Sequence, residues 1–159
     1  HGFAWDRYRQ RVYDESGTLL LRERDRSVHP PHAAPYAGKE PCVAEPTDWL
    51  RRVAPLDPLL ETMYPGYVLG CGVELELAMD LGLRLAVDVS HLHLQRAAGV
   101  LSSSVERRLL EYARVEEVHV SANDGRSDRH ALLQPDTPGL DWARARLADL
   151  PVVLESYWH

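Results

Sequence analysis

Three stretches of the sequence decide the fold that it predicts: LRLAVDVSHLH (residues 83–93), VEEVHVSANDGRSDRH (residues 115–130) and PVVLES (residues 151–156). Each contains a short run of aliphatic and β-branched residues, which is typical of a buried strand. Two similar runs lie earlier in the chain, SVHPP (residues 27–31) and LLETM (residues 59–63), next to prolines that limit a strand. We therefore expect five strands, each with an acidic or imidazole side chain near its end.

Amphipathic segments separate these runs. Residues 73–83 carry leucine and methionine at helical spacing. Residues 102–114 combine an apolar stripe with a serine that can cap a helix, and residues 137–150 predict a third helix. Strands that alternate with helices and have no polar face favour a parallel sheet covered by helices. Such a sheet forms either a (β/α) TIM-type barrel or a doubly wound fold.

Polar residues at the strand ends distinguish these two α/β folds. Barrels collect their functional groups at the C-terminal ends of many strands, whereas GCG at residues 70–72 is a poor match to a nucleotide-binding glycine loop. The strand-end residues are His29, Glu61, Asp88, His91, His119 and Glu155. We expect a TIM-type barrel as a single metal-binding domain over residues 1–159.

About five parallel strands cannot close a barrel. The sequence begins with His1 and ends with His159 soon after an apolar run, so we expect it to be the C-terminal part of a longer barrel. Either the N-terminal strands are missing, or a homo-oligomer or partner chain completes the sheet.

Composition narrows the function classes. A formal net charge of −6 gives no general attraction to phosphate backbones, so we expect a small-molecule substrate rather than nucleic acid. Cys42 and Cys71 are too few for a disulfide framework, which favours the cytoplasm. Without an apolar run of about 20 residues or a leader, we expect no membrane association.

The strand ends offer a set of metal ligands. Asp88 and His91 stand three residues apart, and carboxylate with imidazole is a divalent-metal pair. The alternative for this pair is that Asp88 only caps a helix. His119 ends the next strand, and Asp128 and His130 follow it at alternating positions that point to one side in extended chain.

Glu61 and Glu155 are single carboxylates in otherwise apolar strands. An unpaired buried charge is costly, and a bound metal ion removes that cost. Asp124, in the NDG stretch, is a further candidate ligand, and its alternative role is to form a turn. Tyr64 and Tyr67 follow Glu61 and could line a substrate pocket.

The order of these residues resembles the xylose isomerase-like barrel superfamily, which includes sugar isomerases, epimerases and apurinic endonucleases of the endonuclease-four type. In that family a strand-end Glu precedes D-T-x-H, then a strand-end His with D-x-H, and a last strand ending in L-E. The matching positions are Glu61, DVSH (Asp88, His91), His119 with DRH (Asp128, His130), and Glu155 in VLES. The resemblance covers about residues 27–159.

The resemblance implies a core site of Glu61, Asp88, His119 and Glu155 that holds one Mn, Zn, Co, Mg or Fe ion. The implied activity is isomerisation or epimerisation of a small sugar or hydroxy-carbonyl compound. Glu61 and Glu155 would be the bases, while His91 would orient the substrate or act as a further ligand.

The resemblance also implies two alternative activities. His29, His91, Asp128 and His130 match positions that bind a multinuclear zinc cluster in the endonucleases, which would hydrolyse phosphoesters. The same ligands could serve a multi-iron enzyme that oxidises a peptide. A third alternative is a non-catalytic partner or binding subunit.

The tryptophans have a structural interpretation. Trp49, Trp142 and Trp158 are expected to pack in the core or against helices rather than to stack on a substrate. Trp158 lies closest to the expected metal site in the sequence.

Overall fold

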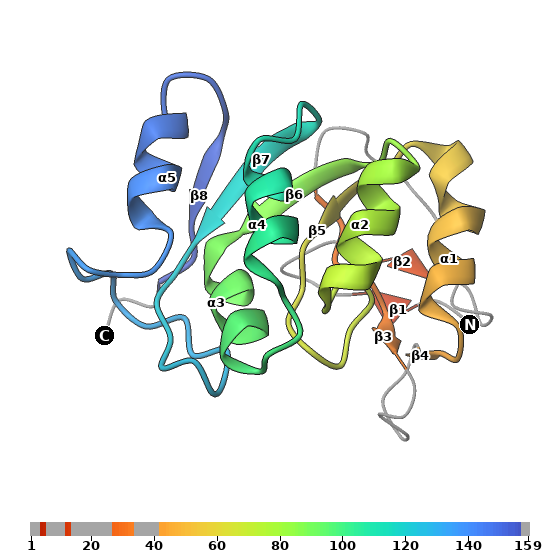
Figure 1. Cartoon of the computed structure of the whole chain (residues 1–159), viewed down its shortest axis with the longest axis horizontal. Helices are drawn as coiled ribbons and strands as arrows, with labels where there is room; N and C mark the ends of the chain where they lie inside the picture. The colour runs from red at the N-terminus through yellow and green to blue at the C-terminus, as the bar shows by residue number, and fades with distance from the viewer. Residues whose placement is uncertain (1–3, 6–11, 14–26, 34–41, 157–159) are drawn as a thin grey trace.

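The computed structural model describes residues 4–5, 12–13, 27–33 and 42–156, and in these ranges the protein is α/β (Figure 1). Its central feature is a parallel sheet of four strands whose spatial order follows the chain. The strands are β5 (Leu59–Glu61), β6 (Arg84–Asp88), β7 (Val115–Val120) and β8 (Val152–Leu154). The expected alternation of strands and helices around a parallel sheet is confirmed.

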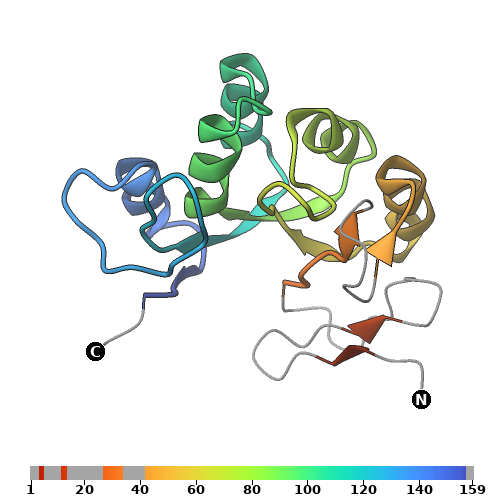
Figure 2. The same ribbon diagram turned by 90° about the horizontal axis from the view of Figure 1, so that it is seen from below.

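Helices connect the strands and gather on one face of the curved sheet, as Figure 2 shows. They are α1 (Pro46–Val53), the 3₁₀ helix η1 (Ala54–Leu56), α2 (Gly72–Asp80), α3 (Val89–Ala97), α4 (Ser103–Leu110) and α5 (Leu140–Arg146). Two further pairs of short strands form separate sheets. They are β1 (Ala4–Trp5) with β2 (Val12–Tyr13), and β3 (His32–Ala33) with β4 (Cys42–Val43).

The strand expected at residues 27–31 is shorter than predicted. Val28 makes one parallel bridge to Leu60 of β5, donating its N–H to Leu59 at 2.8 Å and accepting from Glu61 at 3.1 Å. Pro30 and Pro31 follow and have no N–H to continue the ladder. The segment therefore extends the sheet in the predicted direction without forming a fifth strand.

Caps and turns set the helix bounds. The expected serine cap is confirmed and is Ser102, whose hydroxyl accepts from the N–H of Val105 at 3.3 Å. Helix α5 begins at Leu140, inside the segment predicted for it, after Gly139 in the left-handed region at φ 81°. Helix α1 was not predicted, although Pro46 at its first position is a common start signal.

The hydrophobic core lies between the sheet and its helices. Leu85 and Val118 from the central strands are fully buried against helix residues such as Leu75 and Leu109. Trp49 of α1 is also fully buried, as expected. This packing ties the helices to one sheet face and leaves the strand ends to build the site.

The helices were compared with the length and hydropathy of a membrane-spanning segment. Among the residues that the structure describes, no helix combines the length and the apolar character needed to cross a bilayer.

Candidate metal centre

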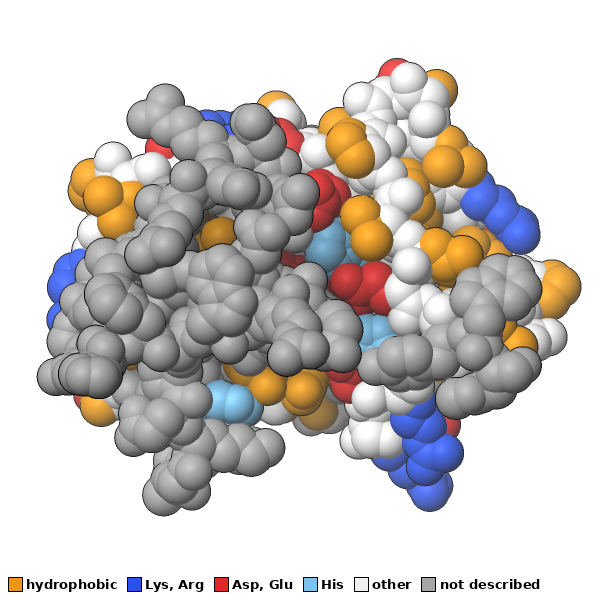
Figure 3. All heavy atoms as spheres, turned by 180° about the vertical axis from the view of Figure 1, so that it is seen from behind, with side chains coloured by type: hydrophobic (Ala, Val, Ile, Leu, Met, Phe, Trp, Pro, Cys, Tyr) orange, Lys and Arg blue, Asp and Glu red, His pale blue; other side chains and the backbone are white. Residues whose placement is uncertain are grey.

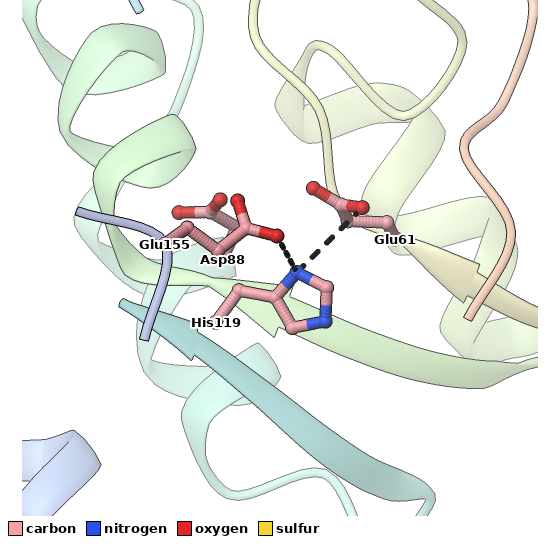
Figure 4. Close-up of side chains that lie close together, drawn as sticks. All are labelled: Glu61, Asp88, His119 and Glu155. Atoms are coloured by element: carbon pink, nitrogen blue, oxygen red, sulfur yellow. Dashed lines mark ion pairs between the residues drawn. The ribbon is translucent and has the colours of Figure 1, made fainter. Parts of the chain in front are cut away.

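Four side chains from the ends of four adjacent strands meet at one point (Figure 4). Glu61 is the last residue of β5, Asp88 is the last of β6, and His119 lies near the end of β7. Glu155 directly follows β8, where its N–H donates to Val120 at 3.0 Å. Because all four strands are parallel, their carboxyl ends share one edge, and the four side chains are brought together.

The spacing of these groups suits a divalent cation. One ligand atom from each residue lies within 4.8 Å of the other three. Ligands on opposite sides of an ion with bonds of about 2.0–2.2 Å are about 4.0–4.4 Å apart, so only small adjustments are needed. The set of three carboxylates and one imidazole could hold a metal ion, and it fits several divalent metals.

Burial makes this cluster costly without a cation. Glu61, Asp88 and His119 are at most 5% exposed, while Glu155 is partly exposed. Figure 3 shows acidic and histidine side chains gathered near the centre of the face opposite the helices. Three carboxylates at low exposure repel one another, and a bound cation would remove that repulsion.

Asp88 performs the two roles that the sequence left as alternatives. Its Oδ1 accepts from the N–H groups of Ser90 at 2.7 Å and His91 at 3.2 Å, which caps α3. Its Oδ2 is buried and has no hydrogen-bond partner among the described residues. One oxygen therefore caps the helix, and the other is available to a ligand.

His119 is oriented by a carboxylate behind it. Its Nε2 lies 2.5 Å from Oε1 of Glu117 and 3.3 Å from the Ser27 hydroxyl. Its Nδ1 faces the cluster, 3.2 Å from Glu155 and 3.7 Å from Glu61, as the dashed lines in Figure 4 mark. A carboxylate that holds the outer nitrogen of a histidine is a common support for a metal ligand.

The charges of the cluster draw protons onto its imidazoles when no metal is bound. Burial alone lowers the pKa of His119, but hydrogen bonds with the neighbouring carboxylates, Glu117 first, outweigh it and raise the pKa to about 12. Burial likewise lowers the pKa of His91, and nearby carboxylates, Asp88 first, raise it to about 9. Burial raises the pKa of the Asp88 carboxyl. Protons thus supply part of the positive charge that a cation would provide.

A second group of potential ligands, formed by His91, Asp128 and His130, lies beside the four-ligand group. The Nδ1–H of His91 donates to the Thr62 carbonyl at 2.8 Å, and that of His130 donates to the Glu155 carbonyl at 2.9 Å. These bonds direct both Nε2 atoms toward Oδ2 of Asp128, at 3.4 Å from His91 and 3.1 Å from His130. Burial raises the pKa of Asp128, but both histidines outweigh it and hold that pKa well below its usual range.

The two groups are in contact. Nδ1 of His91 is 3.5 Å from Oε1 of Glu61 and 3.5 Å from Oδ2 of Asp88. Nδ1 of His130 is 3.6 Å from Oε2 of Glu155. Seven of the eight ligands predicted from the sequence therefore form one continuous cluster.

For His29, the remaining predicted ligand, the described ring contact is with an aromatic residue. His29 is buried, and its ring packs edge-on against Tyr67 with centroids 5.0 Å apart. Tyr67 also lies over His32, and Tyr64 contacts His91 edge-on at 5.0 Å. Among the described residues, the four-ligand group does not include His29.

Local contacts show the structural roles of Asp124 and Trp142. Asp124 forms the turn that was its alternative role, because its carboxylate accepts from the N–H groups of Arg126 and Ser127. Trp142 packs beside the core and donates to the Leu110 carbonyl at 3.2 Å. Trp158 lies outside the described residues.

Two residues that support the site were not predicted from the sequence. Glu117 stands two positions before His119, so the period of a strand places both on one face, and this signal could have found it. Thr62 accepts from the N–H of Asp88 through its hydroxyl and from His91 through its carbonyl. No local pattern marks Thr62, because its two partners lie 26 and 29 positions away in the sequence.

The chain matches no protein-family model, and searches of curated proteins and of solved structures found no significant match. The fold and the ligand group therefore define it as an α/β protein with a candidate metal centre.

Proposed function

We propose that the chain is the metal-binding part of a divalent-metal-dependent isomerase or epimerase that acts on a small sugar or related hydroxy-carbonyl compound. The observation that carries this proposal is the convergence of Glu61, Asp88, His119 and Glu155 within 4.8 Å at the ends of four parallel strands. The resemblance of the ligand order to the xylose isomerase-like superfamily supports it.

We also propose that the sheet belongs to a (β/α) barrel. Two features of the described sheet favour a barrel over a doubly wound fold. Its strands follow chain order without reversal, and its helices lie on one face, whereas doubly wound sheets reverse order and carry helices on both faces (Figures 1 and 2). The ligands at the C-terminal strand ends agree with this fold.

Proton transfer is the step that this chain's own residues would perform. A bound divalent ion would polarise the carbonyl and hydroxyl groups of the substrate. Glu155 is the better placed base, because its side chain is 15% exposed while that of Glu61 is 2% exposed. His91 is fully buried, so in this proposal it orients Asp128 and Glu61 rather than touching the substrate.

The test measures metal content and solvent exchange together. The purified chain is loaded with Mn, Co, Zn, Mg or Fe, and aldoses and ketoses are incubated with it in D₂O. We expect about one metal ion per chain and deuterium incorporation next to the substrate carbonyl. Glu155→Gln should lose the exchange, whereas the distant Glu111→Gln should keep it. A metal-loaded chain that exchanges no tested sugar would contradict the proposed reaction.

A multinuclear hydrolase is the second candidate function. The observation that favours it is the His91, Asp128 and His130 group, whose two Nε2 atoms lie within 3.4 Å of one Asp128 oxygen. Such a group could bind a further cation, and two or more cations can activate water and neutralise a phosphoester.

Stoichiometry separates the two candidates. Two or three metal ions per chain, with hydrolysis of bis(p-nitrophenyl) phosphate, would favour the hydrolase. Asp128→Asn should then remove one ion and leave the four-ligand site loaded. No metal uptake under any condition would favour a binding subunit instead.

A further inference from the structure

A cavity of about 510 Å³ lies beside the metal centre, between α3 and the loop that follows β7. Tyr64, Leu94 and Ala97 form its apolar side, and Arg126 and Asp128 lie on the loop side. The loop packs closely on α3, since a Cβ added at Gly125 would lie 3.3 Å from that of Ala97. The volume is in the range of about 300–1,000 Å³ that small-molecule sites have.

The cavity is continuous with the metal-ligand cluster. Asp128 lines it and also lies 3.4 Å from Nε2 of His91. Tyr64 lines it and contacts the His91 ring edge-on, with centroids 5.0 Å apart. A molecule bound in the cavity would therefore have one end next to the cluster.

The charges around the cavity leave one cation uncompensated. Asp128 is paired with His91 and His130, and Asp124 is paired with Arg129 at 3.3 Å. Among the described residues, the Arg126 guanidinium makes no ion pair and no hydrogen bond; only its backbone N–H is used, by Asp124. A cavity with an apolar wall and an unpaired guanidinium suits a ligand that has a carbon skeleton and an anionic group.

We infer that this cavity is the substrate subsite and that it selects small hydroxy-carbonyl compounds bearing a carboxylate or phosphate, which Arg126 holds. The inference rests on the proposed function, because it takes the adjacent cluster as the reacting centre. The bidentate geometry of guanidinium suits both kinds of anion. The carbon skeleton would pack on Tyr64 and Leu94, with its carbonyl end toward Asp128.

Binding of three matched probes tests the inference. D-Glucose, D-gluconate and D-glucose 6-phosphate are titrated into the full chain by calorimetry at one ionic strength, with and without added metal. We expect at least one anion to bind about tenfold or more tightly than glucose, as a charged hydrogen bond would give. Preference for gluconate would identify the carboxylate, and preference for glucose 6-phosphate would identify the phosphate.

Two arginine variants locate the anion. Arg126→Ala should remove the preference, while Arg129→Ala, on the same loop but outside the cavity lining, should keep it. Both side chains are exposed, so both variants should fold, which circular dichroism checks. Equal binding of all three probes, no binding of any, or an unchanged preference in Arg126→Ala would overturn the inference.

Metal content measured on the same samples keeps the two proposals apart. A chain that binds metal but shows no anion preference contradicts only the subsite. A chain that binds no metal yet loses its anion preference in Arg126→Ala contradicts the proposed function and retains the anion subsite.

Discussion

Asp88 and His119 are direct partners in the register between β6 and β7. Paired residues on neighbouring strands project to the same face, so two ligands from separate strands lie side by side. One pleat earlier, Ala86 stands between Glu61 of β5 and Glu117 of β7. The small side chain of Ala86 leaves room for the two longer carboxylate side chains next to it.

Substitutions can test the helix-capping role and the ligand role of Asp88 separately. Asn caps helices as well as Asp does, so Asp88→Asn should keep the cap on α3 while losing the charged ligand oxygen. Asp88→Ala should lose both and unfold more easily than Asp88→Asn by about 1 kcal/mol. Urea denaturation of the metal-free proteins measures the cap, and metal titration measures the ligand.

The result for metal binding is common to both Asp88 variants. Each should lose most of its metal affinity, because each lacks the Oδ2 charge. Equal stability of the two variants would contradict the capping role, and full metal affinity in Asp88→Asn would contradict the ligand role.

Glu117 should tune the metal affinity without binding the metal. Glu117→Gln weakens the support of His119 Nε2, so we expect metal affinity to fall by about 10–100-fold with unchanged stoichiometry. The matched control is Glu116→Gln, whose side chain instead pairs with Arg84 at 2.7 Å. Competition with a chromophoric chelator measures both, and an equal loss in the control would contradict the positioning role.

Metal uptake should release protons. In the metal-free protein the pKa of His91 is raised to about 9 and that of His119 to about 12, so both imidazoles carry protons at neutral pH. A metal must displace such protons, and its affinity should rise with pH toward 9. Calorimetry in buffers of different ionisation enthalpy counts the released protons, and a count of zero would contradict this charge state.

The raised pKa of His91 also determines whether the stability of the metal-free protein rises or falls with pH. Because the folded-state pKa of His91 is raised, its contribution to the stability of the metal-free protein is complete below the ordinary histidine pKa of 6.5. That contribution disappears as the pH rises from 6.5 through about 9. Urea denaturation without metal should show stability falling over this window, whereas metal-loaded protein should not show this fall.

Alanine substitutions at two glycines would distinguish the cost of backbone strain from the cost of side-chain crowding. Gly99 and Gly139 both have positive φ, at 72° and 81°, so an alanine at either position costs about 1–2 kcal/mol. Only at Gly139 would the new Cβ clash, at 2.7 Å from the Cβ of Val89. Gly139→Ala should therefore destabilise the protein by about 1–3 kcal/mol more than Gly99→Ala, measured by urea denaturation.

Gly139→Ala should also affect the metal site. Val89 directly follows Asp88 at the start of α3, so a displaced Val89 moves the ligand. We expect weaker metal binding in Gly139→Ala and normal binding in Gly99→Ala, which has open space around it. Unchanged metal affinity in Gly139→Ala would show that the chain relaxes elsewhere.

Short apolar runs predicted most of the sheet, and the reasons for the misses are local. The composition of residues 84–88 and 115–120 marks strands whatever surrounds them, because both have buried faces. The run at residues 27–31 looked similar, but its prolines reduce it to one bridge at Val28. Helix α1 was missed because only its Pro46 start signal stands out in the sequence.

The sequence by itself determined which ligand types exist and that they occur at strand ends, since both depend on residue identity and local pattern. Only the tertiary structure decided that Glu61, Asp88, His119 and Glu155 meet while His29 lies against Tyr67. That outcome depends on the register of four strands, which is set by packing across the whole sheet. The two roles of Asp88 likewise follow only from atomic positions. One carboxylate oxygen caps α3 and the other faces the cluster, and the sequence spacing of Asp88 does not predict this.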